Sequence, residues 1–150
     1  MPTSDVNRGE PVDPLVDAVG QVGDRWSLLV IDGLLSGPRR FGELLEDVDG
    51  LAPNILSKRL KQLEADGLIV AEPYSRRPLR HSYRLTAAGE ELAGVLRMLT
   101  QWAASRRPPG SQLPATLTHA ACGSALEARW YCPTCDQVVD HDHTDDVRWL

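Results

Sequence analysis

Apolar and polar residues alternate with two different periods in the middle of the chain. Over residues 41–48, and again over residues 53–65, apolar side chains recur at helical spacing, which predicts two helices with one apolar face each. These apolar positions are Phe41, Leu44, Leu45 and Val48, then Ile55, Leu56, Leu60 and Leu63. Residues 68–71 and 82–85 are short and rich in valine, isoleucine or tyrosine, which predicts two strands. Residues 37–85 are therefore predicted to form two helices followed by a two-stranded wing.

Glycine and proline mark the boundaries of these elements. Asp49-Gly50 is a turn signal between the two helices, because glycine adopts positive φ without steric cost. Pro53 suits the first position of the second helix, where a missing N–H is no loss. Pro73 and Pro78 are predicted to break regular structure, which leaves residues 74–81 as an exposed, arginine-rich loop.

Further helices are predicted on both sides of this stretch. Residues 14–19 form a short helix, and residues 25–35 form a nearly all-apolar central helix with Asp24 as its N-cap. A packed core position is favoured for Trp26 over a place in a ligand pocket. Thr86 is the predicted N-cap of a last helix after the wing. The main domain is thus predicted to be mainly α with a small antiparallel β wing, a winged helix-turn-helix.

The second helix of the pair has the polar face that a DNA-recognition helix needs. Amide and hydroxyl groups suit base edges, and ammonium groups suit phosphate or guanine. The two arginines before the first helix either reach phosphate or pair with Glu43 and Glu46. For any single candidate, the alternative is an ordinary solvated charge. The candidate DNA-binding residues are Arg39, Arg40, Asn54, Ser57, Lys58, Lys61, Arg76, Arg77 and Arg80.

The charge distribution agrees with DNA binding. The chain of 150 residues has a formal net charge of -5, yet between Asn54 and Arg84 seven cations oppose three anions and leave +4. No stretch is long and apolar enough to span a membrane. The first ten residues have neither the basic start nor the apolar run of a secretory signal, and they are predicted to be a disordered arm. We therefore expect a cytoplasmic protein whose partner is double-stranded DNA.

Five short motifs occur in order along the chain: Gly23-Asp-Arg-Trp-Ser-Leu-Leu29, Gly37-Pro-Arg-Arg-Phe41, Leu56 with Arg59-Leu60 and Leu63, Asp66-Gly-Leu68, and Tyr83-Arg-Leu-Thr86 with Gly89. Their order and spacing resemble the HxlR-type winged helix-turn-helix transcriptional regulators, relatives of the MarR group, over about residues 15–102. One departure is Ala52-Pro53, where a serine or threonine usually begins the recognition helix. Because Ala52 has no capping side chain, Pro53 and the turn must set the start of that helix.

The first and last helices of the main domain carry apolar stripes that a small domain cannot easily cover. Such stripes often pair with a second subunit. The resemblance implies a homodimer formed by the terminal helices, with two recognition helices on successive major grooves. The alternative is that both stripes only close the monomer core. The candidate interface residues are Leu15, Val16, Val19, Leu92, Val95, Leu96, Leu99 and Trp102.

The composition changes after this domain, which is assigned to residues 11–105. Residues 106–117 have the composition of a linker, and residues 118–150 are predicted to be a small ribbon-like β appendage. His119 and Cys122 are separated by two residues, as are Cys132 and Cys135, and nine residues lie between the pairs. This spacing is typical of a structural zinc ribbon, in which four nitrogen and sulfur ligands surround Zn²⁺.

Other interpretations of the appendage remain open. His141 and His143 lie near enough in sequence to be alternative ligands. The pair Cys132 and Cys135 could instead be a thiol redox switch, because cysteines at this spacing form disulfides. The third interpretation is a degenerate ribbon that binds no metal.

The function indicated by these patterns is a homodimeric, sequence-specific transcriptional regulator, a repressor rather than an activator. A winged-helix module for protein interaction and a redox-sensing regulator are the alternatives. The chain shows no nucleophile–base arrangement, no glycine-rich phosphate loop and no open metal triad, so we expect no enzyme. An unknown small-molecule effector is compatible with this assignment, although no residue set marks its site.

Overall fold

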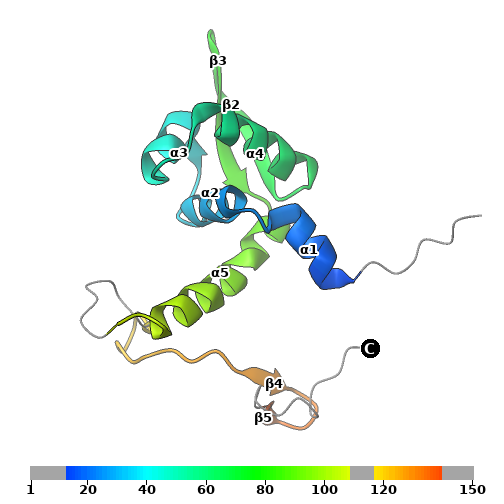
Figure 1. The fold of residues 1–150 in the computed structure, drawn as a ribbon, viewed down its shortest axis with the longest axis vertical. Helices are drawn as coiled ribbons and strands as arrows, with labels where there is room; N and C mark the ends of the chain where they lie inside the picture. The colour runs from blue at the N-terminus through cyan, green and yellow to red at the C-terminus, as the bar shows by residue number, and fades with distance from the viewer. Residues whose placement is uncertain (1–12, 109–116, 140–150) are drawn as a thin grey trace, which may run out of the picture. The chain divides into compact units, whose positions relative to one another are not determined.

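The computed structural model describes residues 13–108 and 117–139 of the chain (Figure 1). The predicted arm at residues 1–10 and most of the predicted linker at residues 106–117 lie outside the described residues, as do His141 and His143. The helices are α1 (Pro14–Val22), α2 (Arg25–Leu35), α3 (Phe41–Asp47), α4 (Pro53–Ala65) and α5 (Ala87–Ser105). The strands are β1 (Arg39–Arg40), β2 (Ile69–Arg76), β3 (Leu79–Leu85), β4 (Trp130–Cys132) and β5 (Gln137–Val139).

The helices begin where the capping residues predict. The carboxylate of Asp24 accepts hydrogen bonds from the backbone N–H groups of Trp26 and Ser27, which are free donors at the start of α2. Thr86 caps α5 in the same way, since its hydroxyl accepts a hydrogen bond from the N–H of Gly89. Helix α4 has no side-chain cap and begins with Pro53 at its first position, as the sequence predicts. Local chemistry thus sets where these helices begin.

The core of the winged helix-turn-helix lies around α2. Helix α2 contacts α3, α4 and β3 (Figure 1). Leucine, isoleucine and valine side chains from all the surrounding elements are buried against it, and Trp26 is half-buried at the edge of this cluster. Burial of an apolar side chain stabilises the fold by about 2 kcal/mol. The apolar stripes of α3 and α4 therefore hold these two helices against α2.

The wing is longer than predicted. Strands β1, β3 and β2 form an antiparallel sheet in that order, so β2 is an edge strand. The prediction that residues 74–81 form an irregular loop was wrong: β2 and β3 pair up to Arg76 and Leu79, and only two residues join them. Pro73 is accommodated because an edge strand has unpaired N–H positions and because the register shifts between Pro73 and Ser75.

The appendage contains a short hairpin. Strands β4 and β5 pair antiparallel, with Trp130 opposite Val139 and Cys132 opposite Gln137. Before the hairpin, Thr118 and Ala125 form an isolated antiparallel bridge around a turn. Within residues 117–139 the appendage therefore contains a two-stranded hairpin and one isolated β-bridge.

Candidate nucleic-acid interface

Helix α4 separates its apolar and polar side chains onto two faces. Leu56, Leu60 and Leu63 are buried in the core. The opposite face is exposed to solvent along the length of the helix, and Ser57 at its margin is half-buried. The exposed polar side chains are those of Asn54, Lys58, Lys61 and Gln62. This face presents amide and ammonium groups that suit base edges and phosphates.

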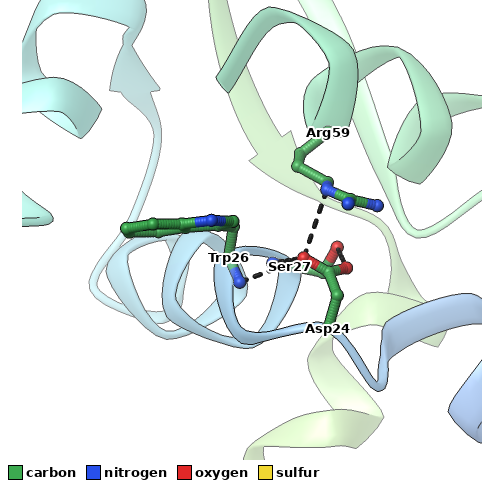
Figure 2. A network of polar contacts seen from close by, with 4 residues as sticks. All are labelled: Asp24, Trp26, Ser27 and Arg59. Atoms are coloured by element: carbon green, nitrogen blue, oxygen red, sulfur yellow. Dashed lines mark hydrogen bonds and ion pairs between the residues drawn. The ribbon is translucent and has the colours of Figure 1, made fainter. Parts of the chain in front are cut away.

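Arg59 differs from its neighbours on α4 because it is held by the start of α2. Its Nε lies 3.1 Å from Oδ1 of Asp24, and both side chains are 29% exposed (Figure 2). Asp24 also accepts hydrogen bonds from Trp26 N at 3.0 Å, from Ser27 N at 3.2 Å and from the Ser27 hydroxyl. One carboxylate therefore caps α2 and pairs with a cation of α4.

This network determines the charge state of Asp24. Partial burial raises the pKa of the carboxyl, but hydrogen bonds from Ser27, the positive charge of Arg59 and the N–H of Trp26 outweigh it. The pKa of Asp24 is consequently lower than usual. Asp24 is thus an anion at neutral pH, which the ion pair with Arg59 requires.

The two arginines before α3 have different surroundings. Arg39 forms an ion pair with Asp47, at 3.1 Å between Nε and Oδ2, rather than with Glu43 or Glu46. The guanidinium of Arg40 lies over the ring of Tyr74, 4.6 Å from its centroid. Arg40 therefore lies between α3 and the wing, and Arg39 is partly neutralised.

The end of the wing is strongly basic. Arg76, Arg77 and Arg80 are exposed around the turn between β2 and β3. Arg84, further down the hairpin, has its Nε 2.7 Å from Oε1 of Glu72, so its charge is compensated. The positive charge counted from the sequence that has no ion-pair partner among the described residues therefore lies at this turn and on α4, where Lys58 and Lys61 are exposed.

Sequence reasoning missed two residues of this region. Arg59 was recognised only as part of a motif, although a cation among the polar residues of α4 was a signal for a charged partner. Tyr74 was placed in the predicted loop, and its aromatic ring was the signal for a contact with an arginine. Neither partner could be identified from spacing, because both contacts join different elements.

The apolar stripes of α1 and α5 are largely exposed. The prediction needs one correction: Leu96 is 7% exposed and belongs to the core, so it is not free to contact another subunit. Leu92 is half-buried against the same core, since the first turns of α5 pack on the domain. The stripe residues that stay exposed are Leu15, Val16, Val19, Val95, Leu99 and Trp102.

In the appendage, each predicted ligand pair is close together. Nδ1 of His119 lies 3.3 Å from Sγ of Cys122, and hydrogen bonds from Ser124 and then His119 lower the pKa of the Cys122 thiol to about 7. Hydrogen bonds from the backbone of Cys135 and Thr134 lower the pKa of Cys132. Within residues 13–108 and 117–139, however, no three histidine, cysteine or acidic side chains come together as a metal site. The pairs fit a soft metal individually but are not assembled into one site.

A family model described as HxlR-like helix-turn-helix matches residues 21–111. The protein belongs to this family. It is a DNA-binding transcriptional regulator of the helix-turn-helix type, not an enzyme. No helix in the described part of the chain has the length and apolar character needed to cross a membrane.

Two regulators illustrate the similarity in sequence. Rv3095 of Mycobacterium tuberculosis, an uncharacterized HTH-type transcriptional regulator, is 35% identical over 139 residues, which cover 93% of this chain and 87% of the relative. The HTH-type transcriptional regulator YodB of Bacillus subtilis is 32% identical over 93 residues, covering 62% of this chain and 83% of YodB.

Two solved structures are also similar to this chain, one over most of its length and one over about two thirds of it. The crystal structure of PA1607, a proposed transcription factor, has a TM-score of 0.76 at 26% identity and covers 94% of this chain and 96% of PA1607. The redox regulator HypR in its oxidized form has a TM-score of 0.59 at 26% identity and covers 64% of this chain and 99% of HypR. The matches to Rv3095 and PA1607 are long enough to span both the winged-helix domain and most of the appendage, whereas those to YodB and HypR are too short to span both.

Proposed function

We propose that the protein is a homodimeric, sequence-specific repressor. The observation that carries this proposal is the exposed polar face of α4 on a buried apolar support, with the basic turn of the wing in the same domain. In this proposal Asn54, Ser57, Lys58 and Lys61 read bases and nearby phosphates. Arg76, Arg77 and Arg80 contact the backbone or the minor groove. A repressor acts by occupying its site, and this requires only a DNA-binding surface and a dimer surface.

The exposed stripes of α1 and α5 support the dimer. Six large apolar side chains in solvent are costly for a monomer, because each would gain free energy on burial. A two-fold dimer would place two copies of α4 about 34 Å apart, one turn of B-DNA. The expected operator is therefore an inverted repeat with half-sites one helical turn apart.

The test is selection of binding fragments from random DNA, followed by footprinting at 50 and 200 mM salt. We expect a two-fold symmetric protected site whose affinity falls steeply with salt, and a dimeric mass in solution. A reporter with this site across its promoter should be repressed. Salt-independent failure to select any DNA would favour the alternative, a protein-interaction module.

We also propose that the appendage binds one structural Zn²⁺ through His119, Cys122, Cys132 and Cys135. The observation that favours it is the juxtaposition of two potential ligands in each pair, at 3.3 Å for His119 and Cys122. Zinc would supply a cross-link between segments that are too short to have a core of their own. Its test is the metal content of the purified protein. Cys135→Ser should lose the metal, whereas Ser124→Ala, which removes a neighbour but no ligand, should keep it.

Redox sensing through Cys132 and Cys135 is the rival function for the appendage. Two thiols would lose two protons and two electrons to a peroxide to form one disulfide, and the hydrogen bonding of Cys132 favours its thiolate. The similarity to the redox regulator HypR covers 64% of this chain, which is too little to include both the whole winged-helix domain and the whole appendage. Peroxide that changes operator affinity in the wild type but not in Cys135→Ser would favour this rival.

A further inference from the structure

The pair of Asp24 and Arg59 connects the segment that follows α1 to the middle of α4. Arg59 is a cation on the helix that carries the proposed base-reading residues, yet it is turned toward α2 rather than toward the exposed face (Figure 2). Its Nε is enclosed and has no hydrogen-bond partner among the described residues, so the carboxylate of Asp24 at 3.1 Å is what compensates its charge. Only this nitrogen is enclosed, since the side chain as a whole is 29% exposed, so loss of the carboxylate would leave one N–H group unpaired and away from water.

Asp24 is itself held rigidly. Besides the three hydrogen bonds at the start of α2, it directly follows Gly23, the C-cap of α1. A Cβ atom at Gly23 would lie 2.4 Å from the carbonyl oxygen of Val19, so only glycine fits there without displacement. The end of α1, the start of α2 and the middle of α4 therefore meet at one carboxylate.

We propose that Asp24 and Arg59 are positioning residues for DNA recognition. Their ion pair fixes the rotation of α4 about its own axis and its position along that axis relative to α2, and Arg59 itself contacts no DNA. This inference rests on the proposed function. Asn54, Lys58 and Lys61 must reach particular base edges together, so a small rotation of α4 reduces specific binding without changing the number of cations near the phosphates. Specific affinity should fall while non-specific affinity does not.

The direction of the change in DNA affinity distinguishes a positioning role of Asp24 from a simple effect of its negative charge. Removing an anion from a DNA-binding domain should by itself raise DNA affinity, because DNA is a polyanion. Asp24→Asn removes the anion but retains a good N-cap for α2. A loss of affinity in this variant therefore cannot arise from net charge or from the cap.

The experiment uses the full chain and the DNA site that the wild type selects from random sequence. We expect Asp24→Asn to bind this site roughly fivefold more weakly, with no loss of affinity for a scrambled duplex. Glu72→Gln is the matched control, because it removes the same charge from the exposed pair with Arg84, and it should show no loss. Arg59→Gln should reproduce the loss seen for Asp24→Asn, and the double variant should be no worse than either single variant.

The remaining outcomes separate a failure of the proposed function from a failure of the positioning role. If the wild type selects no site, the proposed function and this inference are both overturned. If a site is selected but Asp24→Asn binds it as tightly as the wild type, only the positioning role is overturned. If Arg59→Gln lowers the salt slope of the otherwise wild-type protein by about one, Arg59 contacts a phosphate and the inference is wrong. Should Asp24→Asn fail to fold, Arg59→Gln tests the same pair with the α2 cap intact.

Discussion

The guanidinium of Arg40 lies over the ring of Tyr74, with its Cζ 4.6 Å from the ring centroid. This contact joins the residue before α3 to the bulged position of β2, and so it connects the helix-turn-helix to the wing. A cation over an aromatic ring at an exposed site is worth about 0.5–1 kcal/mol. The orientation of the wing arginines thus depends partly on a side chain that is not itself basic.

Replacing Tyr74 should therefore weaken DNA binding through the wing. Tyr74→Ala removes the ring, and we expect a two- to fivefold loss of affinity for the selected site, in line with the free energy of one such contact. Tyr74→Phe keeps the ring and should bind like the wild type. Fluorescence anisotropy with labelled DNA measures both. Equal affinity for all three proteins would exclude a role of this contact in binding.

The basic turn of the wing should contribute to the salt dependence. Arg76 is exposed and forms no ion pair with an acidic side chain of the described residues, so Arg76→Ala should lower the slope of log affinity against log salt by about 0.9. Arg84 is compensated by Glu72 at 2.7 Å, so Arg84→Ala should lower the slope less. Affinity measured from 50 to 250 mM salt gives both slopes. A larger change for Arg84 than for Arg76 would contradict the assignment of phosphate contacts to the turn.

The exposed stripe of α5 should be needed for dimerisation. Leu99→Asp places a carboxylate in the stripe, and we expect it to shift the protein to monomers and to lower operator affinity more than tenfold. Arg97→Asp is the control, because a residue two positions away lies about 200° around the helix. Analytical ultracentrifugation distinguishes the two results. A Leu99→Asp protein that sediments as a dimer would require another interface.

Lowering the pH should reduce the contribution of the Asp24 network to the free energy of unfolding. The pKa of Asp24 is lowered in the folded protein, so the ionised carboxylate stabilises the fold at pH values above its unfolded pKa of roughly 3.9. That stabilisation is lost as the pH falls through the lower, folded pKa. The difference in unfolding free energy between the wild type and Asp24→Asn should thus be constant at neutral pH and shrink below about pH 4. Denaturant unfolding from pH 7 to pH 3 measures it.

Two glycines of α5 should respond in opposite ways to alanine. A Cβ atom at Gly89 would lie 2.2 Å from the carbonyl oxygen of Leu68, so Gly89→Ala forces the helix away from the domain and should destabilise it by about 2 kcal/mol. Nothing lies within 4 Å of a Cβ atom at Gly94, where alanine should stabilise the helix by up to about 1 kcal/mol. Thermal melting compares the stability of the two variants. A Gly89→Ala protein as stable as the wild type would show that the approach of α5 to the carbonyl oxygen of Leu68 is not constrained.

The sequence by itself determined where the helices of the main domain begin and which of their faces are apolar. These properties depend on local features that act within one segment, whatever that segment packs against. They are capping by Asp24 and Thr86, the proline at the start of α4, and the helical period of Leu56, Leu60 and Leu63. Short motifs in order were likewise enough to suggest the family that the comparisons confirm.

Only the tertiary structure decided which charges are free and which apolar residues are buried. Arg59 pairs with Asp24 and Arg39 with Asp47, while Leu96 is buried although Val95 and Leu99 beside it on α5 are exposed. The wing is also longer than its prolines suggested, because β2 is an edge strand and bulges after Pro73. These outcomes depend on the angles at which elements pack, and a residue's partner across a packing interface is not encoded in the spacing of its own segment.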